Sequence, residues 1–250
     1  MKELFVPLAL TPGVTGVFLH APCGKDELCI EDTDTASALR LLNGLICSPS
    51  FDAGDIVTAD RDRIMAHLYI YLYGNKVESV LSCPDCGKPF DINFTLTDLM
   101  KHYPLTSGKT MGKNTYTCGP AYKFRLPTGH DELQVAGSDL ATAEKNLLAL
   151  CTVEGEVPDD PGEVQENMWQ LAPVLSVEMG AICPECGSSR QVLFDIQSFL
   201  LQRLLQERPQ LIHDIHCIAS RYHWPHQDIL ELPRKIRKQY AALIQSDSPS

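Results

Sequence analysis

Four of the ten cysteines lie in two copies of a CPxCG motif, a pattern typical of a metal site. Cys83 and Cys86 form the first copy, and Cys183 and Cys186 form the second. A Cys-x-x-Cys turn places two thiolates on one side of a tight hairpin, and a glycine after the second cysteine permits a positive φ. Because a structural zinc ion takes four ligands, each motif supplies half a site. We therefore expect all four cysteines to hold one structural Zn²⁺.

Other metal or redox chemistry fits these cysteines less well. Iron–sulfur ligation uses similar spacing but usually more clustered cysteines. A dithiol redox pair would explain one motif but not two matched ones. A catalytic zinc keeps an open position and usually recruits histidine or carboxylate, and no such residue stands at a recognisable ligand spacing here. We expect the remaining cysteines to be buried small hydrophobic residues; they are Cys23, Cys29, Cys47, Cys118, Cys151 and Cys217.

Composition and charge narrow the possible functions. The chain has 250 residues, of which 44% are hydrophobic and 21% charged, an ordinary composition for a globular protein. Its formal net charge is −11, whereas a protein that neutralises many phosphates needs a basic face, so nucleic acid is a disfavoured partner. The sequence contains no run of about 18 apolar residues, and its first residues make a poor signal peptide. We expect a cytoplasmic protein without a membrane partner.

The chain repeats itself, with the two metal motifs in equivalent places. Residues 22–28 reappear at 127–133, an offset of 105, and ten of the 24 residue pairs that start at Pro22 are identical. The second CPxCG motif follows the first at an offset of 100. Two blocks in the same order favour a duplication over a chance resemblance of two zinc knuckles. We interpret residues 15–105 and 120–205 as two copies of one unit, packed about a pseudo-twofold axis that completes the zinc site.

Each copy is expected to place its metal motif on a β-hairpin that follows two helices. A Pro-x-Gly-x-Asp-Glu-Leu turn connects the first strand to the first helix in both copies. The elements expected in the first copy are a strand over 14–20, a helix capped by Thr33 or Asp34, a helix over 59–73, and strands over 77–82 and 91–95. Those expected in the second copy are a strand over 122–126, a helix capped by Ser138 or Asp139, a helix over 163–171, and strands over 174–182 and 191–195.

The C-terminal part is unrepeated and helical. Helices are predicted over 199–206, 210–222, 226–232 and 233–244, with a proline suited to the first turn of each of the last two. We predict a partner-binding surface on these helices, made by Trp224, Ile236, Tyr240 and Leu243.

The fold class that follows is α/β (α+β), with internally duplicated strand–helix units joined by a zinc-ribbon-like Cys₄ site and an all-helical C-terminal segment. The predicted division is 1–110 for the first copy, 111–205 for the second, and 206–250 for the helical module.

The repeated turn carries the only acidic pairs that suggest catalysis. Asp26 and Glu27 in the first copy match Asp131 and Glu132 in the second. Because both copies keep them in the same turn, a structural role is the better interpretation. The sequence contains no Ser-His-Asp motif, phosphate-cradling glycine loop or nucleotide fingerprint, so we assign no catalytic residue and expect no enzymatic activity.

Several segments resemble a family of phage proteins. Residues 125–133 are similar to an LPTGxDE segment of the T4-type phage baseplate hub assembly family, which has relatives among contractile injection system baseplate proteins. Residues 72–94 resemble the stretch of the same proteins that contains the CPxCG motif, and residues 216–240 resemble a helical module of tail-assembly proteins. The resemblance implies an assembly factor or structural component of a baseplate or hub, with other tail proteins as partners and incorporation into a phage-tail-like particle as one possible location.

Two other functions stay open at this point. A zinc-ribbon nucleic-acid-binding or regulatory protein would need a basic, aromatic face beside the knuckles, and Lys76, Lys88, Lys101 and Arg190 are few and diluted by acidic residues. A metal-dependent enzyme is the other alternative, and it would require a turnover that depends on the metal without a matching dependence of folding.

Overall fold

Most of the expected helices and strands are present in the computed structural model. It describes residues 3–48, 51–106, 115–119, 122–158 and 160–246. The protein is a mixed α+β fold with small antiparallel sheets and a helical C-terminal part. The chain divides into two compact units, of which the first comprises residues 1–7, 16–53 and 197–250 and the second comprises residues 8–15 and 54–196.

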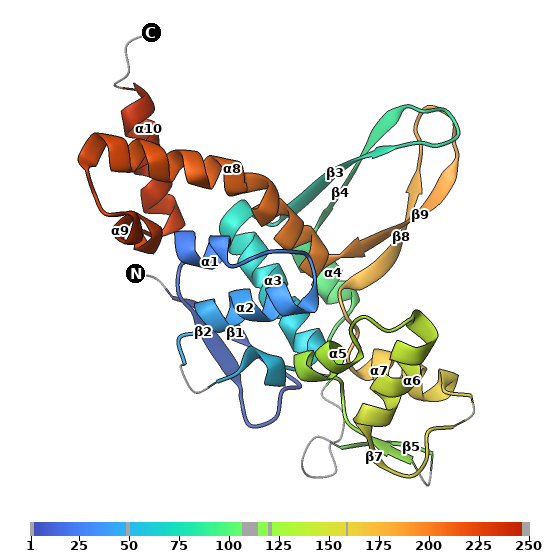
Figure 1. Ribbon diagram of the computed structural model, residues 1–250. Helices are drawn as coiled ribbons and strands as arrows, with labels where there is room; N and C mark the ends of the chain where they lie inside the picture. Colours follow the sequence, from blue (N-terminus) through green and yellow to red (C-terminus); the bar gives the residue numbers. More distant parts are fainter. Residues whose placement is uncertain (1–2, 49–50, 107–114, 120–121, 159, 247–250) are drawn as a thin grey trace. The chain divides into compact units, whose positions relative to one another are not determined.

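The first unit combines one small sheet with helices from both ends of the chain (Figure 1). Asp34 caps the second helix by accepting from the Ser37 N–H, and Leu42 and Leu45 on its apolar face are fully buried, as the helical spacing predicts. The strands, which pair antiparallel, are β1 (Leu4–Pro7) and β2 (Gly16–Leu19). The helices are α1 (Gly24–Leu28), α2 (Thr35–Leu45), α8 (Ile196–Tyr222), α9 (His226–Glu231) and α10 (Arg234–Ser246).

The C-terminal helices differ from the prediction at one place. Residues 199–206 and 210–222 were expected to form separate helices, but α8 runs without a break through Pro209. Proline removes one backbone hydrogen bond from a helix interior. Buried apolar residues lie on both sides of it, including Leu204 and Leu211, and their packing outweighs that cost.

The second unit contains the metal motifs and most of both predicted copies. Its helices are η1 (Ala53–Asp55), which begins at the unit boundary, α3 (Thr58–Tyr73), α4 (Leu96–His102), α5 (Gly129–Val135), α6 (Leu140–Cys151) and α7 (Gly162–Leu171). Its strands are β3 (Lys76–Ser82), β4 (Pro89–Thr95), β5 (Tyr116–Cys118), β6 (Tyr122–Phe124), β7 (Thr152–Glu154), β8 (Ser176–Ile182) and β9 (Ser189–Asp195). Gly74, with a φ of 89°, ends α3 as expected. Asp139 caps α6 in the way that Asp34 caps α2.

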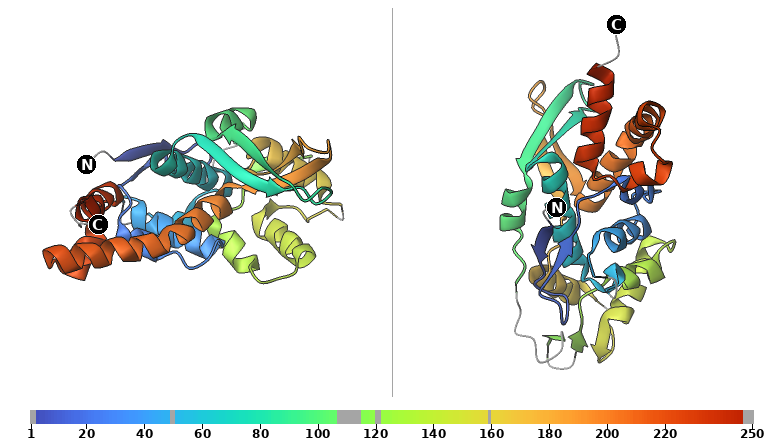
Figure 2. Two further views of the ribbon diagram at one scale, coloured as in Figure 1. Left: turned by 90° about the horizontal axis from the view of Figure 1, so that it is seen from above. Right: turned by 90° about the vertical axis from the view of Figure 1, so that its left-hand side faces the viewer.

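Two hairpins of this unit extend together from its helices, as Figures 1 and 2 show. β3 pairs with β4 and β8 pairs with β9, both antiparallel and over seven residue pairs. The registers are equivalent, because Val77 faces Phe94 and Val177 faces Phe194. The strand alternation places these apolar residues on the inner faces of the hairpins.

The repeated Pro-x-Gly-x-Asp-Glu-Leu segments were predicted to be turns and are instead the short helices α1 and α5. The physical reason is a capping box in each copy, in which the third helical residue bonds back to the N-cap. Cys23 and Asp26 form the first box, and Thr128 and Asp131 form the second. The predicted division into 1–110, 111–205 and 206–250 describes sequence copies rather than compact units, and it stays a prediction.

In the residues that the structure describes, no helix is both long and apolar enough to span a bilayer.

Candidate metal centre

Each CPxCG motif forms the turn of one hairpin. In the first turn, the Cys83 N–H donates to the Lys88 carbonyl at 2.9 Å, and the Gly87 N–H donates to the Cys83 carbonyl at 2.7 Å. Gly87 has a φ of 72°, which a residue with a side chain rarely adopts. The second turn, residues 183–188, makes the same two hydrogen bonds, each 2.9 Å long, and its Gly187 has a φ of 74°. The local sequence thus fixes both turns in one conformation.

The four cysteine sulfur atoms gather between the two hairpins and lie within 4.8 Å of one another. The Sγ atoms of Cys83 and Cys186 are 3.6 Å apart, and those of Cys86 and Cys183 are 3.8 Å apart. Sulfur atoms at the corners of a tetrahedron, each about 2.3 Å from a central zinc ion, would be about 3.8 Å apart. The cluster therefore has the spacing needed to hold one metal ion such as Zn²⁺, with all four ligand positions filled by cysteine.

Each of the following contacts between the hairpins has a counterpart at the positions 100 residues away, with the roles of the two hairpins exchanged. The two sulfur pairs above obey this relation. Lys88 Nζ lies 3.3 Å from Glu185 Oε2, and at the corresponding positions the Ser188 hydroxyl donates to the Asp85 carboxylate. Phe94 and Phe194 meet edge to face, with ring centroids 4.9 Å apart. These contacts are those of two hairpins that face each other in equivalent ways.

One cysteine of each hairpin is buried and the other faces solvent. Cys83 and Cys183 are each 1% exposed, whereas Cys86 and Cys186 are exposed. Apolar side chains surround the buried pair: Phe90, Ala181, Leu81, Ile92 and Val192. An apolar surround limits the access of water to a metal site.

Backbone N–H groups point toward the cysteine sulfur atoms. The N–H groups of Cys86 and Asp85 lower the pKa of the Cys83 thiol to about 7. The Ser188 N–H acts in the same direction on Cys186, but hydrogen bonds with neighbouring thiols raise the pKa of Cys186 to about 12. A divalent cation would stabilise all four as thiolates, with release of protons on binding.

The acidic residues that recur in α1 and α5 have structural partners in both copies. The Asp26 carboxylate accepts hydrogen bonds from the Cys23 N–H at 2.9 Å and from the Cys23 thiol at 3.0 Å. The Asp131 carboxylate accepts from the Thr128 N–H and hydroxyl, both at 2.9 Å. Arg125 adds two further bonds to Asp131, 2.6 and 2.7 Å long. Both aspartates thus cap their own helix.

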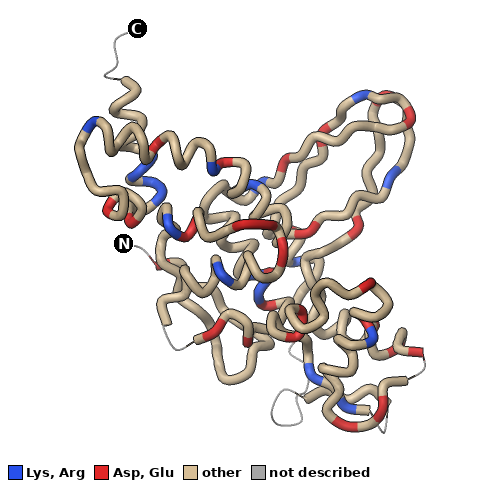
Figure 3. Tube along the Cα trace, viewed as in Figure 1, with Lys and Arg blue, Asp and Glu red and all other residues tan. Residues whose placement is uncertain are grey.

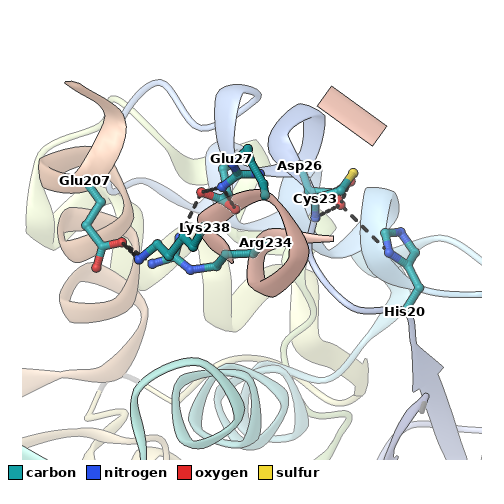
Figure 4. Close-up of polar contacts among 8 residues, drawn as sticks. His20, Cys23, Asp26, Glu27, Glu207, Arg234 and Lys238 are labelled. Atoms are coloured by element: carbon teal, nitrogen blue, oxygen red, sulfur yellow. Dashed lines mark hydrogen bonds and ion pairs between the residues drawn. The ribbon is translucent and has the colours of Figure 1, made fainter. Parts of the chain in front are cut away.

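Glu27 binds the first turn of α10 (Figure 4). Its carboxylate accepts from Arg234 at 2.8 Å and from Arg237 at 2.9 and 3.0 Å. The Arg234 N–H also donates to the Pro22 carbonyl at 2.8 Å, so the backbone just before α1 contacts the same turn. Arg237 is 1% exposed, and the ion pair is therefore buried.

Glu132 binds the first turn of α3 in the same manner. It accepts from the Thr58 hydroxyl at 3.1 Å and from Arg61 at 2.6 Å. The Thr58 N–H donates to the Pro127 carbonyl at 3.0 Å, the counterpart of the bond between Arg234 and Pro22. The two acidic helices, α1 and α5, therefore each bind the first turn of another helix. In both cases the glutamate pairs with an arginine at the fourth position of the bound helix.

Cys23, Asp26 and His20 lie together but lack the features of a reactive thiol (Figure 4). Burial, together with the hydrogen bond to Asp26, raises the pKa of Cys23 to about 11. A nucleophilic cysteine needs the opposite shift, because the thiolate is the reactive form. His20 Nδ1 is 3.8 Å from Asp26 Oδ2 and makes a closer contact, 3.0 Å, with the Ala21 carbonyl. The cluster is better explained by packing and capping.

The predicted partner-binding residues occupy two different environments. Trp224 and Tyr240 are partly buried, meet edge to face with ring centroids 5.1 Å apart, and pack against the apolar cluster of α8 and α9. Ile236 and Leu243 lie on α10 and are 39% and 56% exposed. The last two are thus the accessible members of the predicted set.

Sequence reasoning missed a run of four charged residues at the start of α3 that are all buried, Asp60 to Arg63. Together they bind four other segments of the second unit. Asp60 accepts from the backbone N–H groups of residues 9–11, Asp62 accepts from the Leu175 N–H, Arg61 pairs with Glu132, and Arg63 donates to the Tyr103 and Pro173 carbonyls. The alternation of Asp and Arg is the only sequence signal, since buried charges require partners. Of the other cysteines, Cys23, Cys118 and Cys151 are buried as expected, Cys29 and Cys217 are only partly buried, and Cys47 is exposed in the loop after α2.

In the described part of the chain, the four-cysteine cluster is the one group of three or more His, Cys, Asp or Glu side chains positioned to share a metal ion. Comparisons with protein-family models, with curated proteins and with solved structures find no match to this chain.

Proposed function

We propose that this protein is a non-enzymatic assembly factor or structural component of the baseplate or hub of a phage-tail-like contractile injection system. The observation that carries the proposal is the four-cysteine cluster, because four thiolates from two hairpins leave no open position for a substrate. A closed site of this kind stabilises a fold. The nature of the assembly rests on the motif resemblance alone.

The metal in this proposal is a single structural Zn²⁺ that joins two copies of a duplicated unit. Its support is the interchange of contacts between residues 76–95 and residues 176–195. Structural zinc binding contributes on the order of 10 kcal/mol to folding, which two short hairpins without a large shared core would require. The zinc would thus hold the second unit together, and Ile236 and Leu243 on α10 of the first unit are the accessible residues proposed to bind other tail proteins.

The charge around the hairpins supports a protein partner over a nucleic acid. Residues 76–95 and 176–195 contain three basic and six acidic side chains. Figure 3 shows the two signs interspersed along these strands. Lys88, at the tip of the first hairpin, already pairs with Glu185. A phosphate backbone would meet mainly repulsion on this surface.

Co-purification from the native organism tests the proposal. A tagged, zinc-loaded chain should retain hub or tail components, and deletion of its gene should block or reduce particle assembly. A matched Leu243→Asp variant, altered at an exposed position, should retain zinc and lose part of the tail components. Normal particles after deletion, together with no tail component in the purified fraction, would contradict the proposal. Salt-sensitive DNA binding by the chain would favour the nucleic-acid-binding alternative.

A further inference from the structure

The helix pairs α1–α2 and α5–α6 are related by a sequence offset of 105, but the rest of the protein buries them to different extents. Leu42 and Leu45 of α2 are 0% exposed, whereas the identical residues of α6, Leu147 and Leu150, are only partly buried. The same sequence positions therefore lie against protein in one pair and partly in solvent in the other. Both pairs have the same aspartate cap, and Leu42 and Leu45 recur as Leu147 and Leu150, although Asn146 of α6 takes the place of Leu41; the segments that cover the two pairs also differ.

In the first pair, α8 runs past the connection between α1 and α2. The Gln197 side chain donates to the Thr33 carbonyl at 3.3 Å. Three turns later, the Arg208 guanidinium donates to the Leu28 carbonyl at 3.1 Å and also to the Ile30 carbonyl. The buried leucines of α8 between these two contacts are Leu200, Leu201 and Leu204. One helix thus supplies an apolar stripe and a basic group that binds the carbonyls at the end of α1.

The second pair has a hollow at the corresponding place. It has a volume of about 390 Å³ and lies between the end of α5 and one face of α6. Its lining residues, none of them charged, are Gln134, Val135, Asn146, Ala149 and Leu150. Leu133, the counterpart of Leu28, is 39% exposed beside it. Partly exposed apolar side chains around a neutral hollow are typical of a binding groove.

We propose that the α5–α6 face is a docking site for an amphipathic helix of a partner protein, bound as α8 binds α1–α2. The partner helix would place leucine-like residues at positions i, i+1 and i+4 in the hollow. An arginine or lysine at i+8 would donate to the Leu133 and Val135 carbonyls, the counterparts of those that Arg208 binds. The α8 of this chain, and that of any second copy, is already engaged with α1 and α2, so the helix comes from a different protein. The proposal rests on the proposed duplication and is independent of the identity of the metal.

A peptide with the sequence of residues 196–208 is the probe for this site. It is labelled with a fluorophore and titrated into the full-length, zinc-loaded chain, with anisotropy as the readout. We expect saturable binding that Ala149→Arg, or Asn146→Arg at a second exposed position, weakens at least tenfold. Leu140→Arg is the matched control, because Leu140 is 84% exposed and nine residues from Ala149, on the opposite side of α6. A peptide with serine in place of Leu200, Leu201 and Leu204 should not bind.

Three results would overturn the proposal. They are an absence of binding, equal binding to the Ala149→Arg and Leu140→Arg variants, and peptide-induced protection from hydrogen exchange confined to residues 24–45. Self-association of the chain that Ala149→Arg abolishes would instead identify a second copy as the occupant. Zinc content, measured on every variant, separates loss of the site from loss of the fold. Intact peptide binding without tail components in a pull-down would count against the baseplate role alone.

Discussion

The two hairpins have kept equivalent contacts since the proposed duplication, whereas the two acidic helices, α1 and α5, have come to bind different helices. The hairpins keep equivalent contacts with each other, down to the paired sulfur atoms. The acidic helices keep equivalent internal caps but bind different helices, since Glu27 holds α10 and Glu132 holds α3. A metal shared by two hairpins requires both to retain the same geometry, because each supplies half of the ligands. Helices with separate partners have no such constraint and can diverge.

The largest effect is expected at the shared site. Cys83→Ser and Cys183→Ser occupy equivalent positions, so each should remove nearly all bound zinc and lower the thermal unfolding temperature to a similar extent. Metal content by mass spectrometry and unfolding by circular dichroism measure both quantities. Cys47→Ser, at an exposed cysteine outside the cluster, is the control. Full zinc retention by either variant would show that the hairpins are not equivalent halves of one site.

The next largest effect separates the two glutamates. Glu27→Gln leaves the buried Arg237 without a carboxylate and leaves Arg234 with Glu207 alone, and it should cost about 3–5 kcal/mol of unfolding free energy. Glu132→Gln should cost less, below about 3 kcal/mol, because the Glu132 side chain is 23% exposed and binds one arginine. Urea unfolding of the zinc-loaded protein gives both values. Equal losses would mean that the two helix contacts have not diverged in energy.

A smaller effect is expected at Asp26 and Asp131, the equivalent capping residues of α1 and α5. Asp26→Ala should cost about 1 kcal/mol through loss of the capping box, and Asp131→Ala about 2 kcal/mol because it also loses Arg125. Burial raises the pKa of Asp131, but the bonds from Arg125 and Thr128 outweigh it and hold that pKa below its usual value. Its contribution is therefore full at neutral pH and is lost as the pH falls through the folded pKa. Urea unfolding of the zinc-loaded proteins, followed downward from pH 7 for as long as their zinc content stays unchanged, should show the Asp131→Ala deficit beginning to shrink in acid. A deficit that Arg125→Ala leaves unchanged at pH 7 would rule out this ionic origin.

The smallest effect is expected at the hairpin tips. Lys88→Ala removes the exposed pair with Glu185 and should change the unfolding free energy by about 0.5 kcal/mol or less. Ser188→Ala tests the equivalent position. Zinc content should remain unchanged in both variants. A loss of metal from either one would show that these tip contacts, and not the cysteines alone, hold the hairpins together.

Features that depend on neighbouring residues could be predicted from the amino-acid sequence. The spacing of the CPxCG motifs predicted both hairpin turns and all four cysteines of the cluster, because turn geometry and ligand spacing are local. The caps were narrowed to Thr33 or Asp34 and to Ser138 or Asp139 for the same reason, and the aspartate is the cap in both cases. The Pro-x-Gly-x-Asp-Glu-Leu segments were assigned the wrong element, although the capping pattern that makes them helical is also local.

Contacts between residues far apart in the sequence could not be predicted and became evident from the folded structure. Glu27 binds Arg237, which is 210 residues away, and no periodicity in the sequence connects the two. The continuity of α8 through Pro209 and the burial of residues 60–63 likewise depend on packing that lies outside any sequence window. Local rules act over a few residues, whereas the partner of a buried charge is chosen by how whole helices meet, because an unpaired charge is too costly to bury.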